Sequence, residues 1–176
     1  KREEIFRQEG WNYHLEQKEG PLKYNGVVYN EMKGAFSSPD EVLEREIMNH
    51  LFPDTTYGCE SGGDPKNIPD LTYENFLNFH RTYYHPSNSY IYLYGNMDME
   101  EKLAFLDEHY LSHFDYLDVD SVIQEQKAFG ACQDVTLEYP VAENEGEEDN
   151  TYLSYNMVVG NAADSQMAMA FEVLDY

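Results

Sequence analysis

The sequence predicts an α+β fold, because strand-like and helix-like hydrophobic periods alternate along its 176 residues. Near the N-terminus, Trp11, Tyr13 and Leu15 alternate with polar residues, which is the period of a strand with one buried face. Further on, Leu43, Ile47 and Leu51 recur every fourth residue, which is typical of an amphipathic helix. Hydrophobic residues make up 41% of the chain, so we expect a packed core rather than a disordered polymer.

The first predicted element is a β-hairpin. Residues 18–21 read Lys-Glu-Gly-Pro, which is turn chemistry, and Leu22 and Tyr24 then resume the alternation of residues 11–15. Gly26 ends the second strand of this hairpin.

The stretch from Gly26 to Gly34 is ambiguous between strand and helix. Its Val-Val-Tyr run favours a strand. In a helix, however, Val27, Glu31 and Met32 would lie on one face, with Glu31 as the single carboxylate at the centre. The run is too short for its period to decide between the two.

Four longer helices are predicted from their capping residues and hydrophobic spacing. Ser38 with Pro39 is typical of a helix start, and Pro53 ends that helix. Thr72 and Asp98 cap two further helices, and a last one starts at Asp164. The four helices are expected over residues 39–52, 72–85, 98–114 and from 164 onward.

Three more strands are expected in the middle and at the end of the chain. Residues 89–95 include five consecutive apolar or aromatic residues, which indicates a strand buried on both faces. Residues 135–139 and 151–159 have strand-like patterns on either side of a charged loop. An acidic stretch without a strong period, with a helical or extended piece near Val122, is predicted to be a linker.

The net charge of −23 limits the classes of partner. Such an acidic surface repels phosphate backbones and anionic headgroups, so nucleic acids and membranes are disfavoured and basic peptides are tolerated. Cys59 and Cys132 are far apart and lack Cys-x-x-Cys spacing, which favours two free thiols in a reducing compartment over a disulfide framework. No stretch reaches the ~18 apolar residues of a membrane span.

Local motifs for catalysis are weak. His109 and His113 are four apart in a predicted helix and could clamp a metal, but no acid or cysteine motif accompanies them, so surface histidines are favoured. His80 and His85 are expected to pack against or cap a helix end. The Ser-Gly-Gly-Asp run at residues 61–64 lacks the lysine of a P-loop and is interpreted as a tight turn. No nucleophile motif is present.

A series of ordered sequence blocks resembles one family of peptidases. The blocks are Gln8-Glu9-Gly10-Trp11, Gly26 to Gly34, Ser38-Pro39-Asp40, Leu51-Phe52-Pro53-Asp54, Ser61-Gly62-Gly63-Asp64-Pro65, Leu71-Thr72-Tyr73 and Tyr84-His85-Pro86-Ser87-Asn88. Between Phe6 and Phe114 they resemble the presequence-protease subgroup of the pitrilysin/insulinase zinc metallopeptidases, the inverzincins, in order and near spacing.

The resemblance implies a role for Glu31. In this family two histidines of a His-x-x-Glu-His motif bind zinc, the glutamate of that motif activates water, and a glutamate from a later helix is the third ligand. The Asn-Glu-Met-Lys block is similar to the one that carries this later glutamate. Glu31 is therefore the implied metal ligand, and the resemblance implies that residues around it are helical.

The sequence departs from the family pattern because it contains no His-x-x-Glu-His motif. We therefore expect a piece of a longer zinc endopeptidase, inactive in isolation and without tightly bound Zn2+. The alternative is a piece of a non-catalytic homologue that forms a chamber or binds peptides. The intact block around Glu31 favours the first reading.

The resemblance also implies an architecture. It is an α/β roll, mainly antiparallel sheet with packed helices, repeated in a clam-shell that encloses unstructured oligopeptides, including basic ones. Residues 1–116 would be the latter part of the first, zinc-site domain, residues 117–133 a linker, and residues 134–176 the start of a second homologous domain. The partners implied are peptide substrates and the remaining domains of the longer chain. The low cysteine content favours a bacterial cytoplasm over a mitochondrial or plastid matrix.

Overall fold

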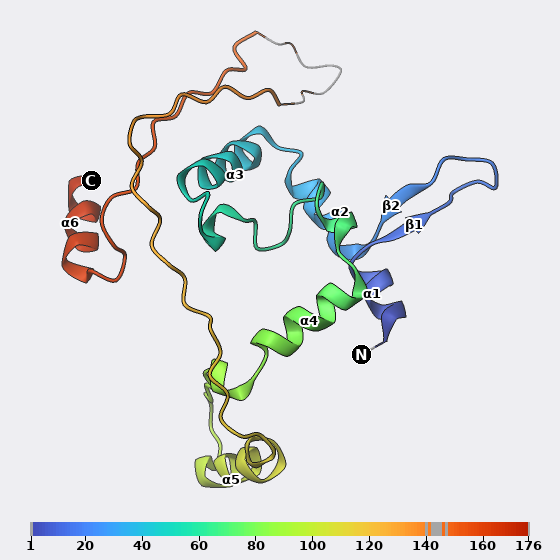
Figure 1. Cartoon of the computed structure of the whole chain (residues 1–176), viewed down its shortest axis with the longest axis vertical. Coiled ribbons are helices and arrows are strands. Elements are labelled where there is room, and N and C mark those ends of the chain that lie inside the picture. Colours follow the sequence, from blue (N-terminus) through green and yellow to red (C-terminus); the bar gives the residue numbers. More distant parts are fainter. Residues whose placement is uncertain (1, 140, 142–145, 147, 176) are drawn as a thin grey trace. The chain divides into compact units, whose positions relative to one another are not determined.

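The computed structural model describes residues 2–139, 141, 146 and 148–175 (Figure 1). The chain divides into two units, which are described separately below. The first consists of residues 1–31 and 64–124, and the second of residues 32–63 and 125–176. The fold is mixed, with helices and one small antiparallel sheet, in agreement with the α+β prediction.

The first unit begins with a helix that the sequence pattern did not predict. Helix α1 (Glu3–Glu9) has Glu3 and Glu4 in its first turn, where carboxylates interact favourably with the helix dipole. One turn later, Arg7 lies 3.2 Å from the Glu3 carboxylate. These charges were a usable helix signal, but Ile5 and Phe6 alone define no hydrophobic period.

The predicted hairpin is confirmed. Strands β1 (Asn12–His14) and β2 (Lys23–Asn25) pair antiparallel, with Tyr13 opposite Tyr24. The strands are shorter than the alternating sequence pattern, and residues between them form the loop at the end of the hairpin (Figure 1).

Helix α2 (Val27–Ala35) follows directly and settles the ambiguous stretch. The helical expectation, which came from the family resemblance, is confirmed. The chain enters α2 through Gly26, whose φ of +149° lies in a region that residues with a Cβ rarely adopt.

The rest of the first unit contains two helices and three short 3₁₀ turns. Helix α4 (Tyr73–Tyr83) begins with a capping box, in which the Thr72 hydroxyl accepts from the Asn75 amide at 3.1 Å and the Asn75 side chain accepts from the Thr72 amide. Asp98 caps helix α5 through the amide of Glu101 at 3.1 Å. The elements are η2 (Ile68–Asp70), α4, η3 (Pro86–Asn88), α5 (Met99–His109) and η4 (Leu111–His113).

The second unit contains α3 (Pro39–Leu51), the turn η1 (Thr56–Gly58) and α6 (Ser165–Asp175). The Ser38 hydroxyl accepts from the Glu41 amide at 3.2 Å, so the predicted start of α3 is confirmed. The Asp164 carboxylate likewise accepts from the Met167 amide at 3.0 Å at the start of α6.

The buried core of the described residues consists of Phe6, Trp11 and Ile68, all in the first unit. Phe6 packs against the rings of Tyr73 and Phe76, with centroid distances of 5.9 and 5.5 Å. These contacts join α1 to α4. The four-residue and neighbouring spacings of Met99, Leu103, Leu106, Tyr110 and Phe114 predict a buried stripe on the helix after Asp98. That prediction is wrong, because these residues are largely exposed and α5 ends before Phe114.

The three other predicted strands are not formed in the described part of the chain. Residues 89–95, 135–139 and 151–159 are extended or irregular, and Tyr90 is fully exposed instead of buried. An extended segment becomes a strand only when a neighbouring strand satisfies its backbone groups, and β1 and β2 pair only with each other. The sequence pattern identifies residues that suit a β-strand, but it does not show whether a partner strand is present.

The predicted linker, residues 117–133, contains neither helix nor strand, so the helical piece considered near Val122 is absent. The predicted division into domains at residues 116 and 134 stays a prediction. No helix among the described residues is long and apolar enough to cross a membrane.

Candidate functional site

Glu31 lies in the middle of α2, and its side chain is exposed. A helix holds the backbone of such a residue rigidly, so the direction of the carboxylate depends on how α2 is seated. The contacts that seat the start of α2 come from Gly10, which follows α1, and from β2.

The start of α2 lies directly against the backbone of Gly10. The Tyr29 amide donates to the Gly10 carbonyl at 3.3 Å. A Cβ placed on Gly26 would lie only 2.3 Å from the same carbonyl oxygen, so no larger residue fits without moving one of the two segments. The glycine at position 26 therefore allows a close approach of the start of α2 to the Gly10 backbone.

Trp11 fixes the Gly10 backbone in place. It is buried, and its indole Nε1 donates to the Leu71 carbonyl at 2.8 Å, which ties the residue before β1 to the segment before α4. Its ring also meets Tyr24 of β2 edge-on, at 5.9 Å between centroids. The chain from Trp11 to α2 is thus held on two sides.

Two side-chain contacts connect β2 to α2. Asn30 Nδ2 donates to Asn25 Oδ1 at 2.9 Å, and the ring of Tyr24 lies 5.8 Å from that of Tyr29. The nearby Tyr13 raises the pKa of the Tyr24 phenol above its ordinary value, because two adjacent phenolates would repel each other. These contacts place Glu31 one residue beyond a well-anchored turn of helix.

The glycine-rich run 61–64 forms the predicted tight turn. The Gly63 amide donates to the Glu60 carbonyl at 3.1 Å, and the φ of Gly63 is +95°. A Cβ on Gly62 would meet the Met32 sulfur at 2.4 Å, so Gly62 packs closely on the residue that follows Glu31. The turn has a packing role at α2 and no lysine for binding phosphate.

The described residues do not gather a complete metal site around the predicted ligand, Glu31. No group of three or more His, Cys, Asp or Glu side chains that could hold a metal ion occurs among them. His14, the one histidine that precedes Glu31, is exposed on β1 opposite Lys23. A single carboxylate supplies one of the several ligands that a structural or catalytic zinc requires.

The other histidines have structural contacts. His80 stacks on Tyr84 at 4.6 Å, and His85 Nδ1 accepts from the Ser87 amide at 3.2 Å at the start of η3, as a packing or capping role predicts. The idea that His109 and His113 share a helix face is wrong, because α5 ends at His109 and His113 lies in η4.

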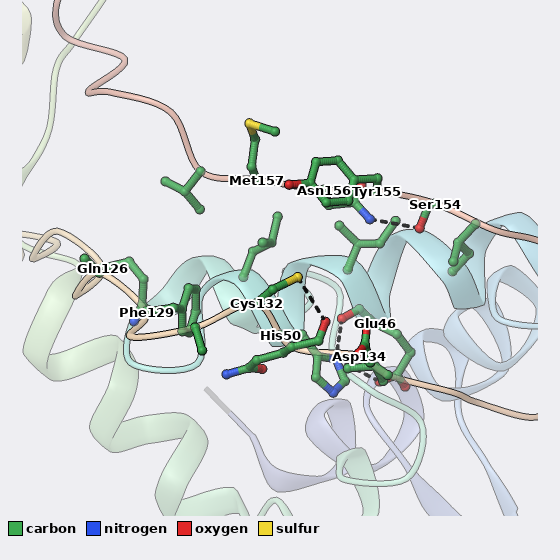
Figure 2. Close-up of a pocket in the computed structure, with 18 of the residues that line it drawn as sticks. Glu46, His50, Gln126, Phe129, Cys132, Asp134, Ser154, Tyr155, Asn156 and Met157 are labelled. Atoms are coloured by element: carbon green, nitrogen blue, oxygen red, sulfur yellow. Dashed lines mark hydrogen bonds and ion pairs between the residues drawn. The ribbon is translucent and has the colours of Figure 1, made fainter.

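The second unit contains an open groove of about 690 Å³ next to α3. One wall comes from α3, a second from residues 126–137 and a third from residues 154–158 (Figure 2). In Figure 2, Ser154 to Met157 lie on one side of the groove, and Phe129, Cys132 and Asp134 on the other. Both cysteines are free, as predicted.

Comparison with known proteins decides the family. A family model described as the peptidase M16 inactive domain matches residues 70–176. The chain belongs to the peptidase M16 family. The resemblance to insulinase-type peptidases is thereby confirmed.

Three relatives match nearly all of this M16 chain. Protein HypA from Clostridium perfringens is 54% identical over 176 residues, which are 100% of this chain and 18% of HypA. Presequence protease 1, chloroplastic/mitochondrial, from Arabidopsis thaliana is 41% identical over 174 residues, 97% of this chain and 16% of the relative. The mitochondrial presequence protease of Xenopus laevis is 37% identical over 177 residues, 98% of this chain and 17% of the relative. The chain thus spans less than a fifth of their lengths.

Proposed function

We propose that this chain is part of a zinc-dependent endopeptidase and that Glu31 is its contribution to the zinc site. The observation that carries the proposal is the exposed carboxylate at the centre of α2, on a helix seated by the Gly10–Gly26 contact. The names of the Arabidopsis and Xenopus relatives, both presequence proteases, support peptide hydrolysis as the activity of the longer protein.

The chemistry of a carboxylate ligand agrees with this role. Zinc held by three protein ligands keeps a position for water, whose pKa it lowers to about 7. The rigid start of α2 would orient the Glu31 carboxylate toward the metal. Two histidines and a general base would have to come from outside this chain, so the isolated chain is inactive.

The substrates proposed are unstructured oligopeptides enclosed in a chamber. The net charge of −23 supports a preference for basic peptides, because an acidic surface raises their local concentration. A salt-independent cleavage rate for basic and acidic peptides of equal length would argue against this preference.

A second candidate is a non-catalytic homologue that forms the chamber or binds peptides. The description of the matched family model as an inactive domain favours it for residues 70–176. Glu31 lies outside that matched region, so the two candidates remain separable by experiment.

The finer architecture belongs to the same proposal. Residues 1–116 would complete an α/β roll that holds the zinc site, residues 117–133 would link it to a second homologous domain, and residues 134–176 would begin that domain. The compartment proposed is a bacterial cytoplasm, with which the bacterial source of HypA is compatible, and the names of the presequence proteases keep a mitochondrial or plastid matrix as the alternative.

The zinc assignment is tested by Glu31→Gln in a longer protein. The chain would replace the matched region of Arabidopsis presequence protease 1, and zinc content and peptide cleavage would be measured. The amide is a poor zinc ligand, so we expect loss of most bound zinc and at least a ~100-fold loss of kcat/KM.

The matched control is Glu44→Gln, which removes an equally exposed carboxylate from α3. It should leave zinc content and cleavage unchanged. Wild-type zinc occupancy and turnover in Glu31→Gln would contradict the ligand assignment.

A further inference from the structure

Helix α2 is too short to be stable through its own backbone hydrogen bonds. It has nine residues, Val27–Ala35, and isolated helices shorter than roughly 12–15 residues are marginal in water. Gly34 weakens its last turn further, because glycine is a poor helix former. Contacts with other parts of the chain must therefore hold both ends of α2 if the Glu31 carboxylate at its centre is to keep one direction.

The second half of α2 is held within the second unit, which begins at Met32. The Phe36 amide donates to the Met32 carbonyl at 3.0 Å, so the backbone of Phe36 continues the hydrogen-bond pattern of the helix. The Ser37 hydroxyl donates to the Gly34 carbonyl at 2.6 Å, and such side-chain bonds satisfy carbonyl groups at a helix end. The backbone that carries the Phe36 ring is thus fixed to the last turn of α2.

Arg45 of α3 covers that ring with a positive charge. Its guanidinium carbon lies 4.8 Å from the centroid of the Phe36 ring, within the range of a cation–π contact. The Arg45 side chain is only 9% exposed, and its guanidinium also pairs with the Glu46 carboxylate at 2.5 Å. A cation–π contact gains strength when water is removed from the cation. The buried guanidinium therefore connects α3 to the last turn of α2.

We propose that Arg45, acting through the Phe36 ring, is a positioning residue for the zinc ligand Glu31. When the contact between Arg45 and Phe36 is lost, the last turns of α2 fray and the carboxylate samples several directions instead of one. Arg45 has no direct role in binding zinc or peptide, so its effect reaches the metal only through the helix. The inference rests on the zinc role proposed for Glu31.

The other contacts of this region do not explain the burial of Arg45 as well. Glu46 follows Arg45 in α3, so their ion pair stays within one helix and holds no part of α2. Gly62 packs on the Met32 side chain, but a flexible thioether adapts to changes in its neighbour. The contact between Arg45 and Phe36 is the one that brings a buried charge onto the end of α2.

Zinc affinity tests this positioning in the Arabidopsis chimera that also tests Glu31→Gln. Competition with a chelator measures the zinc dissociation constant, and steady-state peptide cleavage separates kcat from KM. Arg45→Met removes the charge but keeps a side chain of similar reach. Residues that orient a metal ligand typically contribute 10- to 100-fold to metal affinity, so we expect the dissociation constant to rise about tenfold or more and kcat to fall, with little change in KM. Arg45→Lys keeps a cation over the ring and should restore most of the affinity.

Phe36→Leu tests the other partner of the contact. It removes the π face and should weaken zinc binding as Arg45→Met does, and the double variant should be no weaker than the worse of the two. The matched control is Tyr57→Leu, which removes a ring contact with Phe52 that lies in the same unit and involves no residue of α2. This control should leave the zinc affinity unchanged.

The outcomes separate this inference from the zinc assignment itself. Unchanged zinc affinity in both Arg45→Met and Phe36→Leu would overturn the inference, and zinc loss in Glu31→Gln would still support the ligand assignment. An equal loss of affinity in Tyr57→Leu would also overturn it, because general destabilisation would then be the cause. Wild-type zinc occupancy in Glu31→Gln would contradict the zinc assignment, and the positioning role of Arg45 with it.

Discussion

At the scale of single residues, the direction of the Glu31 carboxylate depends on Gly26. This glycine has a φ of +149° and touches the Gly10 backbone, so both its conformation and its lack of a side chain are needed. A substitution there would act on the site without touching Glu31 itself.

We predict that Gly26→Ala destabilises the protein by about 2 kcal/mol or more, because the backbone would be strained and the new methyl would overlap the Gly10 carbonyl. Urea unfolding of a chimera in which this chain replaces the matched region of HypA would measure this loss. The control is Gly34→Ala on the same helix, where a Cβ meets nothing within 4 Å. Alanine is the better helix former there by about 0.5–1 kcal/mol, so Gly34→Ala should stabilise. Equal effects of the two variants would contradict the proposed role of Gly26.

Glu16 provides a residue-scale prediction about pH. Its carboxylate accepts a hydrogen bond from Lys23 Nζ at 2.9 Å, and this bond and the charge of the ammonium lower the pKa of Glu16. Because its pKa is lower in the folded state, the Glu16 carboxyl stabilises the hairpin at pH values above the ordinary carboxyl pKa. This stabilisation is lost as the pH falls through the lowered pKa. Lys23→Met should therefore raise the pKa of Glu16 toward 4.5.

Carboxyl chemical shifts followed by NMR across the acidic pH range would measure that pKa. Lys33→Met, which removes a lysine from α2 instead, should leave the titration of Glu16 unchanged. A Glu16 midpoint that does not move in Lys23→Met would show that the ion pair is not formed in solution.

At the scale of elements, the sequence predicted the helix caps and the hairpin, because these features depend on residues close together in the chain. The caps at Ser38, Thr72 and Asp98 and the alternation of the hairpin involve residues within a few positions of one another. The strand expected at residues 89–95 failed because pairing depends on a distant partner, which its sequence does not report. The helix that contains Glu31 could be assigned only through the resemblance to the peptidase family. The contact between Gly10 and Gly26 could not be predicted from any hydrophobic period in the sequence.

The turn after α4 holds the following segment through side-chain hydrogen bonds, which leads to a prediction at the scale of elements. Asn88 Nδ2 donates to the Tyr83 carbonyl at 3.0 Å, and its oxygen accepts from the Ser121 hydroxyl at 2.8 Å. The Ser87 hydroxyl also accepts from the Leu117 amide at 3.1 Å. The turn therefore holds residues 117–121, the start of the predicted linker, beside the end of α4.

Asn88→Ala should release this segment, because it removes both side-chain bonds, each worth about 0.5–1.5 kcal/mol. We expect cleavage by endoproteinase Asp-N before Asp118 and Asp120 to become several-fold faster, as followed by mass spectrometry. Asn96→Ala, in an exposed turn of the same unit, is the control and should not change the rate. An unchanged rate in Asn88→Ala would show that the segment is held by other contacts.

At the scale of the whole molecule, the chain combines an anchored helix with only one of the ligands that the proposed zinc site needs. The first unit contains the buried core and includes Glu31, whereas the apolar residues that the structure describes in the second unit are at least partly exposed. Such an arrangement agrees with the proposal that the chain is part of a longer protein, as long as its M16 relatives.

The last prediction follows from this incompleteness. The described residues bring no three metal-binding side chains together, and one carboxylate in water binds zinc weakly because the metal gives up hydration without gaining further ligands. The isolated chain should therefore retain less than about 0.1 zinc per molecule after dialysis and cleave no peptide. Elemental analysis by inductively coupled plasma mass spectrometry measures the ratio, with the Arabidopsis chimera as the positive control. One zinc per isolated chain that disappears in Glu31→Gln would mean that the chain completes a site by itself, and the division of the zinc ligands between this chain and the rest of the protein would be wrong.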